Sequence, residues 1–438
     1  MRNMQRRNFL KALGVGSAGL LIPGYLLADG RTSYKQEGVP GPTAAKGQVV
    51  VVGGGMGGAA VAKYLRLWGG SDLKVTLVEK NANYVSNILS NSVLYGGRTI
   101  SSLTYGYSKL AQNYGISVVQ GDVTAIDPIS HKVFLAGGGE LYYDRLVLSP
   151  GIDFETIPGL ETVEAQAAVP HAWKAGAQTT NLAGQIKAMP AGGVFVMTIP
   201  AAPYRCPPGP YERACVVADY LKKYKPGSKV IVLDANAAIT AEKTNFTYAF
   251  NTVHAGVVDY RPASTVLSID ASNRILDTNW GFIKADVINA IPTNKAGKII
   301  YDAGLNNATS GRFAGVNVLS YESTVGGASG IHIIGDSSAT TQPKAGHIAN
   351  QEGKVCADAI IRSLKGLPPD PSPVTNSSCF TPITMGTASW LSVVYAYDPV
   401  SMTMKPVGGA ATESATISQD NYEEMEEWFA SLMRETFS

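Results

Sequence analysis

Cysteine is the residue type in this sequence best suited to redox and nucleophilic chemistry, and the 438-residue chain has four cysteines. None stands in a C-x-x-C or C-x-x-C-H pattern, so we expect neither a zinc ribbon nor covalently attached haem. Cys206 is the most unusual, because it follows the apolar run GGVFVMTIP in a turn rich in proline. Cys215 and Cys356 fall in segments with helical patterning, where we expect buried, inert thiols. The five histidines lack i, i+4 pairing, so we expect no metal site.

A glycine-rich turn near the N-terminal side indicates a nucleotide site. The segment QVVVVGGGMGGAAVAKYLRLWG has the pattern of a buried strand, a turn and a helix, and LKVTLVEKN that of a second strand. Gly53, Gly55 and Gly58 have G-x-G-x-x-G spacing, and Glu79 follows about 20 residues later. Glycine permits the tight turn, the close approach of a pyrophosphate and close helix packing, while the acid accepts hydrogen bonds from a ribose. The pattern therefore predicts a dinucleotide-binding βαβ unit.

Two later strand ends favour FAD as the dinucleotide. YYDRLVLSPGID runs into Pro150 and Gly151, and IHIIGDSSA contains Gly335 and Asp336. Together with the glycine turn, their order is similar to that in flavoproteins with two dinucleotide-binding folds. The helix predicted next, HIANQEGKVCADAIIRSLKG, would begin at the flavin ring, where its positive dipole end favours the reduced, anionic flavin. The expected cofactor-binding residues are Gly53, Gly55, Gly58, Glu79, Lys80, Asn87, Pro150, Gly151, Gly335 and Asp336.

A second α/β unit, at about residues 159–297, has a different turn. A strand (GVFVMTIP), a helix (YERACVVADYLKKYK) and a strand (SKVIVLDAN) follow one another. In pyridine-nucleotide reductases this position carries a glycine fingerprint for NADH. Here the turn IPAAPYRCPPGPYER lacks that spacing, and its prolines have no N–H groups to donate to a phosphate. We therefore expect no nicotinamide cofactor at this turn, which offers Cys206 instead.

From about residue 47 onward, the chain resembles the flavoprotein subunit of flavocytochrome c sulfide dehydrogenase and, more distantly, sulfide:quinone oxidoreductase. The resemblance is carried by RCPPGPYERA around Cys206, SNILSNSVLYGG, KADVINAIP and TNSSCF around Cys379. It implies an α/β fold with two Rossmann-like domains, as in glutathione reductase, plus a C-terminal interface domain. It also implies a redox-active disulfide between Cys206 and Cys379 beside the flavin; the alternative is a plain stabilising disulfide, worth ~2–5 kcal/mol.

The resemblance implies a reaction in which hydrosulfide attacks one sulfur of that disulfide, leaving a persulfide and a thiolate whose electrons reduce FAD. Arg205 and Arg213 could stabilise the thiolate charge. Glu212 is suggested as a proton-handling residue, although an acid in the first turn of a helix is often only a cap. Cys206, Cys379 and Glu212 are therefore the expected catalytic residues.

The resemblance also bears on how FAD is held. Many members of the family attach FAD through a cysteine in the stretch after the first acid. In this chain the stretch is NYVSNILSNSV, and Asn87 stands about where that thiol would be. We therefore predict that FAD is bound without a covalent link.

The N-terminal segment QRRNFLKALGVGSAGLLIPGYLLA is typical of a twin-arginine export signal, with Arg6 and Arg7 before a glycine-rich apolar stretch. That stretch is shorter than the ~20 residues of a membrane span. We expect a periplasmic protein without stable membrane insertion. The predicted segments are the signal (1–28), a leader (29–46), two parts of an FAD-binding domain (47–158 and 298–366), the second Rossmann-like domain (159–297) and the C-terminal domain (367–438).

An electron acceptor is needed for reduced flavin, and the resemblance implies a c-type cytochrome subunit in a heterodimer, with haem only on that partner. The C-terminal segment YEEMEEWFASLMRETF has one apolar stripe and one acidic face. Membrane-surface helices usually carry Lys or Arg opposite the apolar face, so we expect this helix to pack on the chain itself or on a protein partner. With a formal net charge of +2 and no basic run interleaved with aromatics, we expect no nucleic-acid partner.

Two alternative functions remain open from the sequence. A sulfide:quinone oxidoreductase would normally have a further active-site cysteine between the first acid and Cys206, and residues 1–205 contain none. A flavin-binding or sulfur-carrying protein without catalytic activity is the other alternative, and the retention of both Cys206 and Cys379 argues against it.

Overall fold

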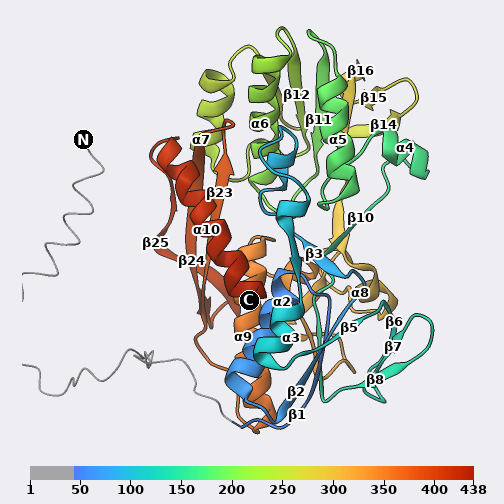
Figure 1. Ribbon diagram of the computed structural model, residues 1–438, viewed down its shortest axis with the longest axis vertical. Helices are drawn as coiled ribbons and strands as arrows, with labels where there is room; N and C mark the ends of the chain where they lie inside the picture. The colour runs from blue at the N-terminus through green and yellow to red at the C-terminus, as the bar shows by residue number, and fades with distance from the viewer. Residues whose placement is uncertain (1–43) are drawn as a thin grey trace, which may run out of the picture. The chain divides into compact units, whose positions relative to one another are not determined.

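The computed structural model of the protein describes residues 44–438 (Figure 1). The predicted export signal, residues 1–28, and most of the predicted leader, residues 29–46, lie outside the described residues.

The first sheet contains eight strands in the order β22-β19-β20-β21-β9-β1-β2-β5. Its centre is parallel, because β1 pairs in parallel with both β2 and β9. The valine run forms β1, where Val49 to Val52 are buried, as expected for a strand covered on both faces. The strands that frame the site are β1 (Gly47–Val52), β2 (Leu73–Glu79), β5 (Ser117–Gln120), β9 (Arg145–Leu148) and β21 (Ile331–Ile333).

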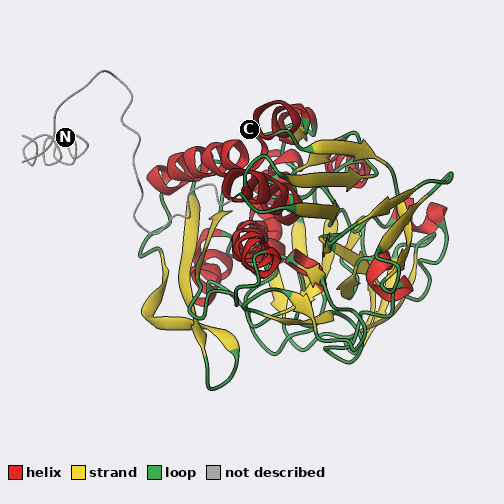
Figure 2. Cartoon of the chain, turned by 90° about the horizontal axis from the view of Figure 1, so that it is seen from below, coloured by secondary structure: helices red, strands yellow, loops and turns green. Residues whose placement is uncertain are grey.

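Two helices, α2 (Met56–Gly69) and α9 (Gly346–Leu364), pack against each other beside this sheet (Figure 1). Figure 2 shows a group of helices lying against strands. Helices α2 and α9 approach closely where glycine faces backbone, since a Cβ added at Gly353 would lie 2.9 Å from the carbonyl oxygen of Gly57. Cys356 is fully buried within α9, which confirms the prediction for that thiol.

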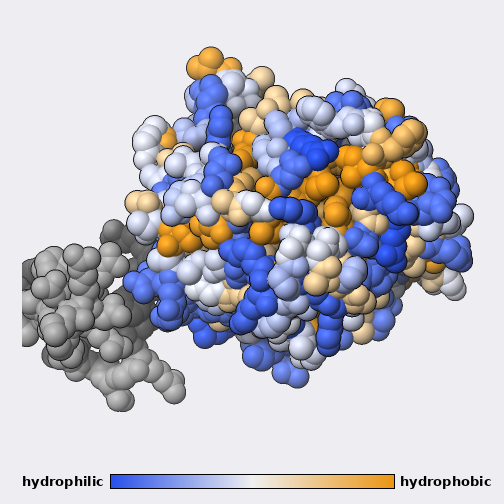
Figure 3. Space-filling model, turned by 90° about the horizontal axis from the view of Figure 1, so that it is seen from above, coloured by the Kyte–Doolittle hydropathy of each residue, from blue (hydrophilic) through white to orange (hydrophobic). Residues whose placement is uncertain are grey.

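The second unit has a four-stranded parallel sheet in the order β13-β12-β11-β17. Cys215 is fully buried in α6, as predicted. A three-stranded antiparallel sheet, β14-β15-β16, adjoins this unit, and Leu267 and Phe282 are among its exposed apolar side chains. Figure 3 shows exposed hydrophobic residues on the face of the molecule seen from above. The elements are α5 (Ala177–Ala188), β11 (Val194–Ile199), α6 (Gly209–Tyr224), β12 (Lys229–Asp234), β13 (Val258–Arg261), β14 (Val266–Asp270), β15 (Ile275–Thr278), β16 (Gly281–Lys284) and β17 (Val287–Ala290).

The C-terminal part is a three-stranded antiparallel sheet covered by α10 (Gln419–Phe437), drawn in red in Figure 1. Its strands are β23 (Val374–Pro382), β24 (Ala388–Asp398) and β25 (Thr403–Glu413). The apolar stripe of α10 packs on the chain's own body, since Met425, Phe429 and Met433 are buried in one core with residues of α2 and α9. The helix thus follows one of the two placements expected from the sequence.

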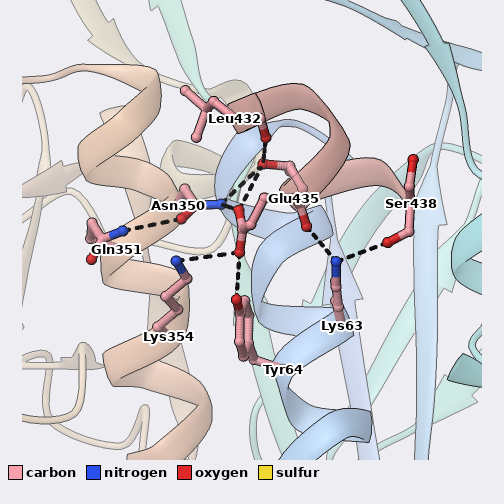
Figure 4. Close-up of polar contacts among 9 residues, drawn as sticks. Lys63, Tyr64, Asn350, Gln351, Lys354, Leu432, Glu435 and Ser438 are labelled. Carbon is pink, nitrogen blue, oxygen red and sulfur yellow. Dashed lines mark hydrogen bonds and ion pairs between the residues drawn. The ribbon is translucent and has the colours of Figure 1, made fainter. Parts of the chain in front are cut away.

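The end of α10 is fastened to α2 and α9 (Figure 4). Lys63 of α2 is buried and donates hydrogen bonds to the main-chain carbonyls of Glu435, at 2.5 Å, and Ser438, at 2.8 Å. Such carbonyls have no partner within a helix, so the lysine satisfies them. The Glu435 carboxylate in turn contacts Tyr64 (2.5 Å), Asn350 (2.6 Å) and Lys354 (3.3 Å).

The remaining elements connect these parts. β10 pairs antiparallel with β18 and joins the two Rossmann-like units. The remaining elements are β3 (Asn83–Val85), β4 (Thr104–Gly106), α3 (Ser108–Tyr114), β6 (Val123–Asp127), β7 (Lys132–Leu135), β8 (Glu140–Tyr142), β10 (Ile152–Phe154), α4 (Val163–Ala168), α7 (Lys243–Tyr248), β18 (Asn294–Ala296), α8 (Lys298–Asp302), β19 (Ala314–Asn317), β20 (Glu322–Ser323) and β22 (Ser338–Ala339).

Candidate active site

A cavity of about 840 Å³ runs between the first sheet, the turn after β11 and strand β23. Its size falls within the range of about 300–1,000 Å³ that is usual for small-molecule and cofactor sites. All the residues predicted for the site line this cavity except Gly58. The predicted residues that line it are Gly53, Gly55, Glu79, Lys80, Asn87, Pro150, Gly151, Cys206, Glu212, Gly335, Asp336 and Cys379.

The glycine turn explains why Gly58 is the exception. Gly53 has φ +98°, and a Cβ there would lie 2.3 Å from the carbonyl oxygen of Ser149. A Cβ at Gly58 would lie 1.8 Å from the carbonyl oxygen of Gly53, so this glycine serves the packing of α2 onto the turn. At Gly55 the nearest atom to an added Cβ is 3.9 Å away, in Tyr84, which leaves the backbone open to the cavity.

The start of α2 provides backbone donors for an anion. Gly55 occupies the N-cap position, and no side chain of the described residues caps the helix there. The first N–H groups of a helix lack partners and attract phosphate. Glu79 holds the turn, because its carboxylate accepts from Gly54 N at 2.7 Å and from Asn81 N at 2.9 Å, while it also lines the cavity.

The turn after β21 supplies the opposite wall. Gly335 has φ +71° and donates its N–H to the Glu352 carboxylate at 2.6 Å. Burial raises the pKa of Asp336, whereas the charges of Arg205 and Lys344 lower it. The N-terminus of α9, at Gly346, also lines the cavity, as predicted from the sequence. Together with Glu79 and the α2 N-terminus, these groups form a donor and acceptor set that fits a dinucleotide.

The turn that carries Cys206 is held by three backbone contacts. Cys206 N donates to the carbonyl of Lys344 at 2.7 Å, and its carbonyl accepts from Gly209 N at 2.9 Å. Arg205 N donates to the Asn294 side chain at 3.0 Å. Cys206 has φ +58°, a left-handed conformation that is uncommon for residues other than glycine and concentrates at functional sites. The thiol is therefore presented by a fixed turn.

Cys379 comes from the middle of β23, far away in sequence, and lines the same cavity as Cys206. Both are free thiols in the structure, and both are partly buried. Burial raises the pKa of Cys206, and the charge of Cys379 raises it further. Burial also raises the pKa of Cys379 to about 12, with Glu242 and Glu212 adding to the effect. The charge of one thiol thus affects the pKa of the other, while their pairing as a disulfide stays a prediction.

Glu212 lies in the first turn of α6, but the N-cap position is Pro208. The Glu212 carboxylate instead accepts a hydrogen bond from the Asn91 side chain at 2.8 Å. Burial raises the pKa of Glu212 to about 8, against the lowering effect of Asn91 and Arg213. A carboxyl group with this pKa can hold or release a proton near neutral pH.

The two arginines differ in their environment. The charge of Arg205 lowers the pKa of Cys206, as expected for thiolate stabilisation. Arg213 is 1% exposed, and its donors bind oxygen atoms of the chain rather than a sulfur. The acceptors are Asn91 Oδ1 (2.8 Å), Asn289 Oδ1 (2.9 Å), His171 O (2.9 Å) and Ala172 O (2.7 Å). Arg213 therefore fixes the wall of the site.

Asn87 lines the cavity. It stands at about the position where the resemblance implies a flavin-binding cysteine in many members of the family. Its side-chain oxygen accepts a hydrogen bond from Ala175 N at 2.8 Å, which holds the segment 173–175 at the cavity. An amide at this position has no sulfur for a thioether, and the absence of a covalent link to the flavin stays a prediction.

Several residues of the site were missed in the sequence. Glu242 packs behind β23, and burial raises its pKa to about 7. Trp428 of α10 lines the cavity and contacts Phe380, with ring centroids 5.4 Å apart. His347 also lines it and accepts a hydrogen bond from Ser378 N at 3.0 Å. The helical pattern could place Trp428 only on an apolar stripe, and no local pattern marks Glu242 or His347.

The acid at the end of β12 is used inside the fold. Asp234 is fully buried and accepts hydrogen bonds from Tyr211 at 2.7 Å and Tyr260 at 2.8 Å. It also accepts from Asn236 N at 2.9 Å. In a dinucleotide-binding unit, an acid at this place would face a ribose.

Among residues 44–438, no group of three or more His, Cys, Asp or Glu residues could hold a metal ion. In the same residues, no helix has the length and apolar character that crossing a membrane requires.

The fold and the cavity define a class, the flavoproteins with two dinucleotide-binding folds. Residues 47–181 match the family model of pyridine nucleotide-disulphide oxidoreductases. The chain superposes on the sulfide:quinone oxidoreductase of Aquifex aeolicus with a TM-score of 0.71 and 18% identity, covering 90% of this chain and 91% of that one. It superposes on a putidaredoxin reductase complexed with putidaredoxin with a TM-score of 0.61 and 18% identity, covering 89% and 94%. The predicted α/β fold is thereby confirmed.

The family within this class follows from the sequence matches. Residues 179–292 match the model of the sulfide dehydrogenase [flavocytochrome c] flavoprotein chain, central. The sulfide dehydrogenase [flavocytochrome c] flavoprotein chain of Chlorobaculum thiosulfatiphilum is 54% identical over 46 residues, which are 10% of this chain and 94% of the relative. The chain belongs to the family of flavocytochrome c sulfide dehydrogenase flavoprotein chains, as its resemblance implied. Membership in this family implies a flavin cofactor.

Other curated relatives match over shorter shares of their length. The mitochondrial sulfide:quinone oxidoreductase of Dictyostelium discoideum is 27% identical over 198 residues, which are 44% of this chain and 42% of the relative. The chain spans less than half the length of this and two further relatives, at 42%, 27% and 24%.

Proposed function

We propose that this protein oxidises hydrosulfide through a disulfide between Cys206 and Cys379 and delivers the electrons, by way of bound FAD, to a c-type cytochrome subunit. The observation that carries the proposal is the convergence of two thiols from distant segments in the cavity that the glycine turn also lines. The proline-rich turn supplies one thiol and β23 the other, so each sulfur is held by a different rigid element.

FAD, when bound, would accept two electrons together and release them one at a time. The residues that fit its binding are the N-terminus of α2 for the pyrophosphate, Glu79 for a ribose, and Asp336 with the N-terminus of α9 for the remainder. Asn87 leaves the attachment non-covalent. We expect acid precipitation of the purified protein to leave the flavin in the supernatant, and flavin in the pellet would contradict this point.

The cysteines and Glu212 would carry out the first half of the reaction. Hydrosulfide attacks one sulfur, a new S–S bond forms, and the old S–S bond breaks, which leaves a persulfide on one cysteine and a thiolate on the other. Arg205 favours the thiolate form of Cys206 through its charge. Glu212 holds the proton that the incoming hydrosulfide gives up, because its pKa of about 8 lies near working pH.

The proposed cytochrome would dock at α10. Trp428 of this helix lines the cavity, and the exposed face of the same helix is acidic, with Asp420, Glu423, Glu424 and Glu427. Opposite charges across an interface steer association and fix orientation, so a cytochrome with a basic edge fits this face. The similarity to the Chlorobaculum thiosulfatiphilum protein, which is named as a flavocytochrome c flavoprotein chain, supports such a partner. The twin-arginine pattern supports a periplasmic place of action.

A quinone is the alternative acceptor, and the extensive superposition on a sulfide:quinone oxidoreductase favours it. The two acceptors are distinguished by one experiment. Sulfide is mixed anaerobically with the purified protein, and the flavin absorbance is followed. Cytochrome c or a soluble quinone is then added, and reoxidation is timed.

The expected result is bleaching by sulfide and faster reoxidation by cytochrome c. Reoxidation by quinone alone would establish the alternative acceptor. If sulfide does not bleach the flavin, the protein is a flavin-binding or sulfur-carrying protein instead. Glu140→Gln, an exposed change in the hairpin β7–β8, serves as the matched control variant.

A further inference from the structure

Polar side chains stand beside Cys379 on one face of the C-terminal sheet. Alternate residues of a strand share a face, so Thr381 lies on the same side of β23 as Cys379. The register pairs Thr381 with Ser389 and Cys379 with Leu391. Thr381 also lines the cavity, although it is only 1% exposed. A polar side chain on the same strand face as Cys379 thus lines the cavity and is otherwise buried in the protein interior.

Thr381 and Ser389 together hold a buried carboxyl group. Glu242 precedes α7 and is 4% exposed. Its carboxylate accepts hydrogen bonds from Thr381 Oγ1, at 2.9 and 3.0 Å, and from Ser389 Oγ, at 2.6 Å. A hydroxyl group can donate one hydrogen bond while it accepts another. Thr381 is therefore able to pass a proton between Glu242 and the cavity.

The polar contacts continue from Glu242 toward β25. Ser389 Oγ lies 3.0 Å from Ser414 Oγ. Glu413, paired with Leu391 on the next strand, lies in the same cross-strand row as Cys379. One of its carboxylate oxygens is buried and has no hydrogen-bond partner among the described residues. This half-buried acid thus lies near the interior carboxyl group without a hydrogen bond from that oxygen to the network, and it acts on Glu242 through its charge.

Burial and the neighbouring groups bring the pKa of the Glu242 carboxyl group close to neutral pH. Burial raises the pKa of Glu242 to about 7, the hydroxyls of Ser389 and Thr381 lower it, and the charge of Glu413 raises it. The other titratable groups that face it are Glu212 and Cys215 from α6 and Cys379 from β23. Glu242 in turn acts on Cys379, because the pKa of the Cys379 thiol is raised first by burial and then by the charge of Glu242.

We propose that Glu242 exchanges a proton with Cys379 through the hydroxyl of Thr381. The inference rests on the proposed function. The thiol of Cys379 loses its proton to become a thiolate, Thr381 hands a proton on, and the Glu242 carboxylate becomes a carboxylic acid. The Cα atoms of residues two apart on a strand lie about 7 Å from each other. The path from the Cys379 thiol to the Thr381 hydroxyl therefore passes through water in the cavity that both residues line. Among the described residues, the hydrogen bonds of the Glu242 carboxylate run to Thr381 and Ser389, so the proton passes through Thr381, while the charge of Glu242 acts on Cys379 through space.

The first test measures the thiol rather than turnover. In the full-length Cys206→Ser protein, alkylation of Cys379 by iodoacetamide is followed from pH 5 to 11 by peptide mass spectrometry. The same series is run with Glu242→Gln added. Removing a nearby negative charge lowers a thiol pKa, so we expect Cys379 to react at least about 10-fold faster at a pH below its midpoint. The control Glu140→Gln leaves the profile in place, and an unchanged profile in Glu242→Gln overturns the inference.

The second test separates proton transfer from packing. The rate of flavin reduction by sulfide is measured against pH in the wild type and in Glu242→Gln, Thr381→Val and Thr381→Ser. Because Glu242 ionises as the pH rises through about 7, the wild-type rate should rise there. Glu242→Gln and Thr381→Val should lose this limb and about 10²-fold in rate, while Thr381→Ser restores both.

Failure of the inference differs from failure of the proposed function. If sulfide does not reduce the wild-type flavin, the proposed function is wrong. The pH profile of alkylation still tests whether Glu242 affects the Cys379 thiol, because it does not depend on sulfide oxidation. If sulfide reduces the flavin and Thr381→Val retains the full pH limb, the function stands and the proton route through Thr381 is wrong.

Discussion

The two Rossmann-like units of this chain share a topology and differ in the turn between the first strand and the helix. After β1, Gly53 and Gly58 let the helix begin against the strand, and its N-terminus lies open to a phosphate. After β11, prolines fill the turn and Cys206 adopts the left-handed conformation. The same strand–turn–helix frame thus holds a cofactor in one case and a thiol in the other.

The strand ends differ in the same way. Glu79, the last residue of β2, holds the glycine turn and still lines the cavity. Asp234, the last residue of β12, is fully buried and accepts hydrogen bonds from two tyrosines. The comparison teaches that an acid at the same strand end can serve the fold instead of a ligand, because hydroxyl donors from the chain bind it where a nucleotide-binding unit would offer a ribose.

The largest effect is expected from the two cysteines of the proposed disulfide, one of which lies in the turn after β11. Cys206→Ser and Cys379→Ser each remove one partner of the proposed disulfide, so the rate of flavin reduction by sulfide should fall by at least about 10³-fold. The flavin content should stay at the wild-type level, since the glycine turn is untouched. Rapid-mixing absorbance at matched protein concentration measures both quantities. A serine variant that keeps the wild-type rate would remove the disulfide from the mechanism.

A smaller effect is expected from the carboxyl group in the first turn of α6. Glu212→Gln should slow the same step by about 10²-fold. In the wild type, the rate should rise as the pH increases through about 8, where Glu212 ionises and can accept a proton. The variant should lack this rise. Glu164→Gln, an exposed acid in the first turn of α4, is the control, and equal pH profiles in the two variants would contradict the role.

The first turn can be disrupted by a single methyl group. Gly58→Ala places a Cβ 1.8 Å from the Gly53 carbonyl, so overpacking should cost about 1–3 kcal/mol of unfolding free energy and reduce the bound flavin. Gly184→Ala in α5, where an added Cβ meets nothing within 4 Å, should bind flavin normally. Denaturant unfolding and the ratio of flavin to protein absorbance report the result. Full flavin content in Gly58→Ala would show that the turn tolerates the methyl group.

The smallest effect is expected at the sealed acid of the second unit. Tyr211→Phe removes one donor to Asp234 and leaves Tyr260 in place, so the unfolding free energy should fall by about 1 kcal/mol. Sulfide should still bleach the flavin, and NADH should bleach it in neither protein. Tyr224→Phe, at an exposed tyrosine, is the control. Reduction by NADH in the wild type would show that the second unit has kept a nucleotide site.

Local patterns predicted the fold and the cofactor wall well. The valine run, the glycine spacing and the strand ends at Gly151 and Gly335 each have one local physical cause, so they could be predicted from neighbouring residues. Cys379 was found only through a resemblance, because no rule of periodicity joins it to Cys206. Glu242 could not be found at all, since its role depends on the register between Thr381 and Ser389. Partners across a sheet are set by tertiary packing rather than by sequence spacing.

The fastening of α10 by Lys63 has a consequence for electron transfer. The helices that begin at the cofactor wall, α2 and α9, are tied to the far end of the helix that carries Trp428. The tunnelling distance from the cavity to the proposed docking face therefore depends on contacts among α2, α9 and α10. Lys63→Ala, remote from both, should loosen that spacing and broaden the distribution of transfer rates.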